Sequence, residues 1–285
     1  MLRSRLAQLA LALGLLPTLP VGACDLRDFM TLPLPETDRP AFALALELAY
    51  PGLRVDEVAG QVVMENGQTL PVGQDDGRAA KAILSDASIA EQFTQVYPLA
   101  FDLTARDTPW FDPGRFRNDA FFRALWFADE ASAAHSLVTV RYPGVQVQPR
   151  FAMTRKHCVA HQLEGAFKAI ASLEDPSLEQ FFTQVGGSFN WRVIAGTTRL
   201  SSHSFGIAID LNTALGGYWR WSGASEGAVG RYENRYPEAL VTTLERFGFI
   251  WGGKWHHFDG MHFEYRPELI LHARLVAGRS VIRAG

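Results

Sequence analysis

Two stretches of the sequence decide its fold, SSHSFGIAID at residues 201–210 and WGGKWHHFDGMHFEY at residues 251–265. In the first, the imidazole of His203 precedes a glycine turn and a short apolar strand that ends on the carboxylate of Asp210. Side chains alternate between the two faces of a strand, so the apolar neighbours of Asp210 point into the opposite layer. Gly206 lets the backbone turn tightly, and we therefore expect His203 and Asp210 to meet at one point.

The second stretch predicts the rest of a metal site. His262 and Glu264 share one face of a strand, and Asp259 lies three residues before His262, where a turn brings its carboxylate close. Two imidazoles and one carboxylate, with a water in the fourth position, make a catalytic zinc site. We expect His203, Asp210 and His262 to hold Zn²⁺. Zinc lowers the pKa of its water to about 7, and Asp259 is the candidate that takes and redelivers the proton.

Each of these residues has an ordinary structural explanation when taken alone. A single histidine such as His203 usually caps a helix or packs in a core, and Asp259 followed by glycine is a common turn. A buried Asp210 at the end of an apolar strand nevertheless needs a partner, because an unpaired buried charge is costly. The joint pattern therefore favours the metal site.

Three more polar residues of the second stretch have open roles. Glu264 is expected to accept a hydrogen bond from a zinc-bound imidazole or a backbone group, with a solvent-exposed strand charge as the alternative. His256 and His257 are expected in a solvent-exposed loop, although one of them could contact a substrate.

The amino-acid composition limits the classes of protein to which this chain can belong. The chain has 285 residues, a mass of 31.6 kDa and a formal net charge of −3, and its hydrophobic and charged fractions of 47% and 20% are those of a globular protein. Disordered, collagen-like and coiled-coil chains are thereby excluded. No basic excess is present, so we expect no nucleic-acid partner.

Residues 1–23 are typical of a secretory signal peptide, with two arginines, an apolar run over residues 6–16 and small residues before the expected cut. A membrane anchor is the alternative, but the run is shorter than the roughly 20 residues of a span. We expect an exported protein of the periplasm or cell envelope without a transmembrane helix in the mature chain.

The sequence contains two cysteines, Cys24 and Cys158. Cys24 follows Val21-Gly22-Ala23, which is similar to a bacterial lipobox, so a lipid anchor on Cys24 is one expectation. The other is a disulfide between Cys24 and Cys158, which suits an oxidising compartment. The two exclude each other.

Periodicity and turn residues give a coarse layout. We expect an N-terminal extension of unknown role over residues 24–150 and the main domain over residues 151–285. The expected elements are a hairpin around residues 62–70, mainly helix over 76–135, a strand at 137–142, helices at 159–173 and 237–247, strands at 249–251 and 261–265, and a final helix after Pro267.

The paired motifs, Ser-x-His-x-x-Gly-x-Ala-x-Asp at residues 201–210 and Asp-x-x-His at residues 259–262, resemble those of the M15 family of zinc peptidases. That family contains D-Ala-D-Ala carboxypeptidases and dipeptidases, and L-Ala-D-Glu endopeptidases that cut peptidoglycan stem peptides. The resemblance covers residues 185–270. It implies an α+β fold with a central antiparallel sheet that carries the zinc site, flanked by helices, here with a mostly helical N-terminal extension.

Carried over by position, His203, Asp210 and His262 resemble the zinc ligands of the family and Asp259 its catalytic base. The sequence HFE at residues 262–264 is closer to the endopeptidase branch, in which the base is an aspartate.

The family also uses an arginine upstream of the first ligand to hold the substrate carbonyl. Arg192 and Arg199 are the two candidates, and Arg192 is preferred because it ends a strand-like aromatic segment.

Together these features predict an exported zinc metallopeptidase that hydrolyses amide bonds in peptidoglycan stem peptides, as a D-Ala-D-Ala carboxypeptidase or an L-Ala-D-Glu endopeptidase. The alternative is a non-catalytic zinc module for binding or signalling, because Hedgehog signalling domains resemble this fold and keep the metal. Asp259 distinguishes the two, since a purely structural zinc site does not require that carboxylate.

Overall fold

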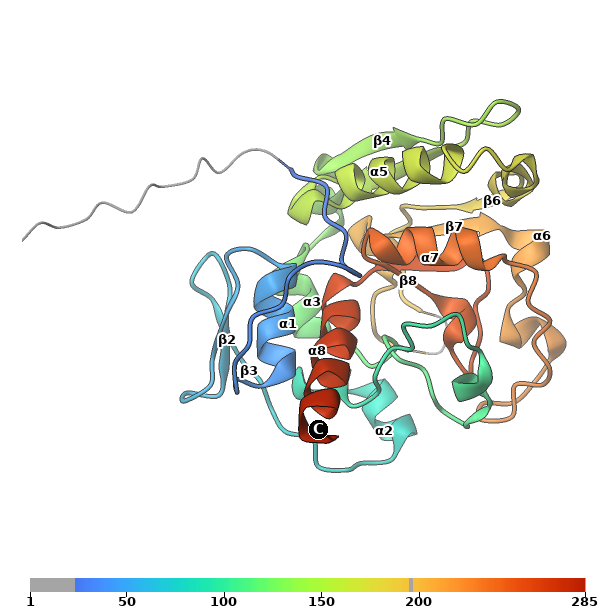
Figure 1. Ribbon diagram of the computed structural model, residues 1–285. Helices are drawn as coiled ribbons and strands as arrows, with labels where there is room; N and C mark the ends of the chain where they lie inside the picture. Colours follow the sequence, from blue (N-terminus) through green and yellow to red (C-terminus); the bar gives the residue numbers. More distant parts are fainter. Residues whose placement is uncertain (1–23, 195–196, 285) are drawn as a thin grey trace, which may run out of the picture.

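The structure is a computed structural model that describes residues 24–194 and 197–284 (Figure 1). The signal peptide expected at residues 1–23 lies outside the described residues. Among the helices that are described, none has the length and apolar character needed to cross a bilayer.

A four-stranded antiparallel sheet lies at the centre, in the order β6 (Val185–Gly187), β7 (Ala208–Asn212), β9 (His262–Tyr265) and β8 (Phe249–Trp251). The apolar residues that alternate along β7 and β9 are fully buried, as their period of two requires. With its flanking helices, this sheet confirms the predicted α+β class with a central antiparallel sheet.

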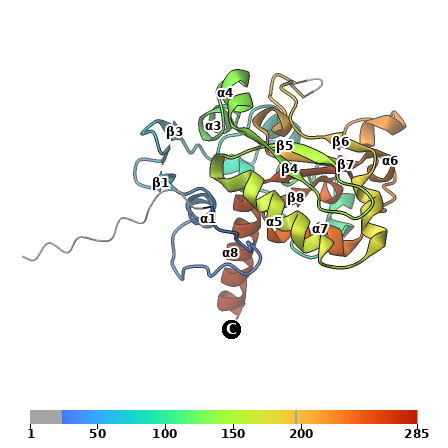
Figure 2. The same cartoon turned by 90° about the horizontal axis from the view of Figure 1, so that it is seen from above.

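Helices α7 (Glu238–Arg246) and α8 (Pro267–Ala284) pack on strand β8 of this sheet. The helices α5 (Val159–Ala171) and α7 pack against each other, and Figure 2 shows them side by side. Helix α7 starts after Pro237 and ends just before Gly248, which has a φ of +92°. Proline at the start and glycine past the end are the signals that predicted its limits.

The N-terminal part contains one longer helix and several short elements. Helix α1 (Ala41–Ala49) packs on the C-terminal helix α8 (Pro267–Ala284), and next to it lies a small antiparallel sheet of three strands, β1, β2 and β3 (Figure 1). The region expected to be mainly helical forms short helices separated by irregular segments. The elements of that region are α2 (Ala80–Ser85), η1 (Ala90–Phe93), η2 (Thr104–Asp107), α3 (Asp119–Leu125) and α4 (Glu130–His135). The three strands that precede it are β1 (Arg54–Asp56), β2 (Gln61–Val63) and β3 (Thr69–Pro71).

A hairpin connects the two halves of the chain. Strands β4 (Leu137–Arg141) and β5 (Arg150–Thr154) pair in an antiparallel register, so a boundary placed at residue 150 would cut through this hairpin. One hydrophobic core also contains residues from both sides of that position, from Phe29 to Leu275. The remaining short elements are η3 (Lys156–Cys158), η4 (Pro176–Phe182), η5 (Ser202–Phe205), α6 (Thr213–Gly216), η6 (Trp219–Ser222) and η7 (Gly252–Lys254).

Cys24 and Cys158 form a disulfide that ties the start of the described chain to the beginning of α5. This is the second of the two expectations for Cys24, and it uses the sulfur to which a thioether-linked lipid would attach.

Candidate active site

The register of β7 and β9 places two of the predicted ligands opposite each other. Asp210 pairs with His262, and Ala208 pairs with Glu264 two residues further along. Directly opposite residues of an antiparallel pair project from the same face. The sheet thus holds Asp210, His262 and Glu264 on one side, while Phe263 packs into the core on the other.

His203 reaches this face from η5. The turn after it needs Gly206, which has a φ of +66° and whose missing Cβ would lie 2.7 Å from a methyl group of Leu137. Nδ1 of the His203 ring contacts the backbone carbonyl of Ser188, which fixes the ring and leaves Nε2 for the cluster.

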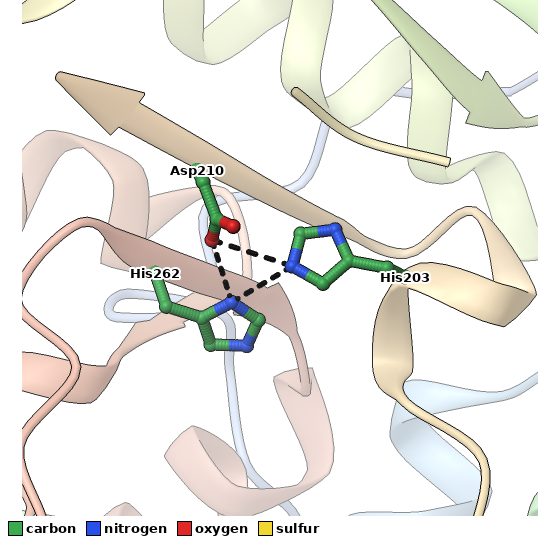
Figure 3. Close-up of side chains that lie close together, drawn as sticks. All are labelled: His203, Asp210 and His262. Atoms are coloured by element: carbon green, nitrogen blue, oxygen red, sulfur yellow. Dashed lines mark hydrogen bonds and ion pairs between the residues drawn. The ribbon is translucent and has the colours of Figure 1, made fainter. Parts of the chain in front are cut away.

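The three predicted ligands converge (Figure 3). Nε2 of His203 lies 3.1 Å from Nδ1 of His262 and 3.3 Å from Oδ1 of Asp210, and that oxygen lies 2.9 Å from Nδ1 of His262. One ligand atom from each residue falls within 4.8 Å of the others. Two nitrogens and one carboxylate oxygen in such a group are the donor set of a catalytic zinc site.

The electrostatics of the cluster favour a cation. Burial works to raise the pKa of Asp210, but the two imidazoles outweigh it and hold that pKa far below its usual range. Burial works to lower the pKa of His262, but hydrogen bonds to Asp210 and Glu264 raise it to about 10. Positive charge is thus stabilised at the point where the three side chains meet, and a divalent cation bound there would supply that charge.

Glu264 contacts Nε2 of His262, the ring nitrogen that does not face His203 and Asp210. It is buried, and its Oε2 lies 3.4 Å from Nε2 of His262 while Oε1 accepts a hydrogen bond of 3.1 Å from Arg266. Burial works to raise its pKa, but His262, Arg117 and Arg266 outweigh burial and lower it, so the side chain is ionised. The alternative of a solvent-exposed charge is wrong, because the residue is only 3% exposed.

Asp259 lies at the turn before β9, and its Oδ1 is buried without a hydrogen-bond partner in the part of the chain that the structure describes. Burial raises the pKa of this carboxyl to about 6, although the positive charge of His262 works against the shift. A buried carboxylate oxygen that no protein group satisfies is unusual and needs an explanation. Its position beside the three ligands fits a group that handles protons at a metal site.

These residues open into one cavity of about 330 Å³. Its lining joins the ligands and Asp259 with aromatic and cationic side chains. The residues are Gly114, Arg115, Arg117, Arg192, Ile194, Arg199, Ser201, Ser202, His203, Asp210, Tyr218, Trp221, Trp255, Asp259, Met261, His262 and Glu264.

Both candidate arginines line this cavity. Arg192 is exposed, whereas Arg199 is buried and donates a hydrogen bond of 2.9 Å from Nη1 to the carbonyl of Arg115. Arg115 and Arg117 also line the cavity, and sequence reasoning missed both of them. They come from an irregular segment more than 80 residues before the motifs, and no local pattern marks them.

The same N-terminal segment holds the loop that carries Asp259. The carboxylate of Asp112 accepts hydrogen bonds from the backbone N–H of His257, at 2.8 Å, and from its ring nitrogen Nδ1, at 2.6 Å. The backbone N–H of His256 donates to the carbonyl of Phe111. The expectation of a solvent-exposed loop was therefore wrong, because this segment covers both histidines and buries them.

Residues 195–265 match a family model described as D-alanyl-D-alanine carboxypeptidase. No curated protein and no solved structure gives a match to the chain. The matched region contains the three converging ligands, Asp259 and Glu264, whereas Arg192 and the N-terminal segment lie outside it. The region that builds the His203–Asp210–His262 cluster is therefore similar to the peptidases of the M15 family.

Proposed function

We propose that the protein is an exported zinc metallopeptidase that hydrolyses amide bonds in peptidoglycan stem peptides. The observation that carries this proposal is the buried, unpartnered carboxylate oxygen of Asp259, which lines the same cavity as His203, Asp210 and His262. The match of residues 195–265 to a D-alanyl-D-alanine carboxypeptidase model supports the reaction class.

Nε2 of His203, Oδ1 of Asp210 and Nδ1 of His262 would hold the zinc ion. When bound, zinc supplies Lewis acidity, which makes water a better nucleophile at neutral pH and polarises the scissile carbonyl. Carbonyl contacts from Ser188 to His203, and the carboxylate of Glu264 next to His262, orient the two rings for this purpose.

The chain itself supplies the proton transfer. As the oxygen of a water molecule forms a bond to the carbonyl carbon, Asp259 accepts a proton from that water and then delivers it to the nitrogen whose bond to carbon breaks. A pKa of about 6 suits a group that must both take and give a proton near neutrality. Arg192 supplies positive charge for the carbonyl oxygen as that oxygen becomes negative.

A non-catalytic module of the same fold is the competing function. Such a module needs the three ligands but gains nothing from Asp259, whose buried carboxylate costs free energy without a protein partner. This cost favours the peptidase.

Two features support export. Residues 1–23 have the pattern of a signal peptide, and the Cys24–Cys158 disulfide suits an oxidising compartment such as the periplasm.

Digestion of purified muropeptides by the zinc-loaded protein tests the proposal. Mass spectrometry of the products should show loss of a terminal alanine for a D-Ala-D-Ala carboxypeptidase, or a cut nearer the sugar for an L-Ala-D-Glu endopeptidase. If the zinc-loaded protein leaves all muropeptides intact, the non-catalytic function is favoured instead.

A further inference from the structure

Four arginines line the cavity beside the predicted ligands, Arg115, Arg117, Arg192 and Arg199. Arg117 lies 3.9 Å from the carboxylate of Glu264. Within the described ranges 24–194 and 197–284, the other three form no ion pair with an acidic side chain. This face of the cavity therefore carries positive charge that the protein does not balance by direct pairing.

Two of these groups are deeply buried and incompletely bonded. Arg199 and Arg117 are 5% and 6% exposed, and both Nε of Arg199 and Nη1 of Arg117 are buried without a hydrogen-bond partner in the described chain. Burial, together with repulsion by Arg117 and Arg115, lowers the pKa of Arg199 to about 9. Of the two, Arg199 has no acidic partner in the described chain, and an unpaired buried charge is strongly destabilising, so its position suits a site that receives an anion.

The acidic residues that line the cavity already have other partners or another assigned role. Asp210 contacts the two histidines, and Glu264 contacts His262 and Arg266 and lies 3.9 Å from Arg117. Asp259 is the group assigned to proton transfer. A carboxylate on a ligand would supply the negative charge that Arg115 and Arg199 lack as a direct partner.

Arg115 shows where that charge would lie. Its Nη1 donates a hydrogen bond of 3.0 Å to the carbonyl of His257, and its guanidinium carbon lies 5.7 Å from the centre of the Trp255 ring. His257 lies two residues before Asp259, the residue assigned to proton delivery, and Arg115 and Asp259 line the same cavity. A substrate whose leaving nitrogen reaches Asp259 would therefore carry its next group toward this guanidinium.

We infer that Arg115 and Arg199 form a subsite for a carboxylate on the substrate residue that supplies the leaving amine. This inference rests on the proposed peptidase function and gives the N-terminal segment a role in substrate recognition. The residue that leaves carries a free carboxylate in both candidate reactions, as the terminal D-Ala or as D-Glu. Arginine suits this group, because its planar fork can donate two parallel hydrogen bonds to a carboxylate.

Two pairs of synthetic peptides test the subsite, one pair ending in D-Ala-D-Ala and one containing L-Ala-D-Glu. In each pair, the carboxylate of the leaving residue is either free or converted to a primary amide. Calorimetry measures their affinity for the zinc-loaded Asp259→Asn protein, and cleavage is followed with the wild type. The free acid of at least one pair should bind about 10- to 100-fold more tightly than its amide.

Substitutions identify which arginines cause the preference for the free acid. Arg115→Met should reduce the preference for the acid about 10-fold or more, Arg199→Lys should reduce it in part, and Arg115→Lys should retain some of it. Arg54→Met, which changes a 61% exposed arginine on β1, is the matched control and should keep the full preference. Circular dichroism confirms that each variant is folded.

The outcomes separate the subsite from the peptidase function. Equal affinity for acid and amide in both pairs, no measurable binding of either, or an unchanged preference in a folded Arg115→Met protein overturns the subsite. A clear preference for the acid without cleavage by the wild type supports the subsite and counts against the peptidase function.

Discussion

Asp210 and His262 face each other across β7 and β9, with Oδ1 of Asp210 2.9 Å from Nδ1 of His262. A shift of β7 by one residue in this register would move Asp210 to the opposite face, away from His262, and would expose the apolar residues of β7 that are now buried. The packing of the core thus fixes the geometry of these two predicted ligands, and η5 adds His203 as the third.

Zinc should stabilise the folded protein, because the ligands converge only in the fold. At a free zinc concentration 100 times the Kd, the gain is about 2.7 kcal/mol, which corresponds to a rise in Tm of roughly 5–10 °C. His203→Ala and His262→Ala should lose this rise and the bound metal, whereas His161→Ala, on α5, should keep both. Thermal unfolding with and without a chelator, together with metal analysis, measures the effect. Stoichiometric zinc in both ligand variants would contradict the site.

Asp259→Asn should lower kcat by about 10²- to 10⁴-fold, because the amide cannot accept the proton from water. Zinc content should not change, since Asp259 is not among the three ligands. Asp107→Asn, which changes a carboxylate that is 79% exposed, serves as the control and should keep full activity. Wild-type rates in the zinc-loaded Asp259→Asn protein would remove this residue from the mechanism.

Glu264→Gln should weaken zinc binding about 10- to 100-fold, because a neutral amide supports the imidazole of His262 less well than a carboxylate does. Glu268→Gln is a matched control, since Glu268 is also buried and pairs with Arg266 but has no contact with His262. Zinc affinities from competition with a chromophoric chelator compare the two variants. An equal loss in both would mean that Glu264 acts only on stability.

Asp112→Asn should lower the free energy of unfolding by about 1–3 kcal/mol, because the amide cannot accept both hydrogen bonds from His257. Burial works to raise the pKa of Asp112, but His257 and Arg115 outweigh it and lower the pKa in the folded state. The stabilisation is therefore complete above the unfolded pKa of about 4 and is lost as the pH falls through the folded pKa.

Denaturant unfolding of the wild type and Asp112→Asn between pH 7 and pH 3 checks this dependence. The difference should be constant at the upper end and shrink below about pH 4. Asp76→Asn, at an exposed position, should change stability by less than about 0.5 kcal/mol. A difference that grows toward low pH would have the wrong sign.

Loss of the Cys24–Cys158 disulfide, which joins residues 134 positions apart, should cost about 2–4 kcal/mol. Cys24→Ser, Cys158→Ser and the double variant should be destabilised equally, because each removes the same bond. A reducing agent should destabilise the wild type and leave the variants unchanged. Intact-mass measurement of protein purified from cells provides an independent check, since a lipid on Cys24 would add mass and leave Cys158 free.

The sequence by itself was sufficient for features that depend on local pattern. Pro237 and Gly248 define α7, and the alternation along residues 207–210 and 262–265 assigns each ligand to a face of its strand. The spacing of His203, Gly206 and Asp210 likewise predicts a tight turn followed by a strand. These inferences succeed because a strand or helix has a fixed period, so the identity of nearby residues determines which side chains share a face.

The groups that complete the cavity from distant parts of the sequence could be identified only from the folded structure. Asp112 and Arg115 form hydrogen bonds with His257, in the loop of Asp259, although they lie more than 140 residues before it in the sequence. The two cysteines form a disulfide, and His257 is buried beneath a segment that no motif marks. A periodic pattern reports the direction of a side chain but not its partner. Contacts between residues far apart in sequence depend on the packing of the whole core. The place of Arg115 and Arg117 in the cavity could therefore be recognised only in the folded protein.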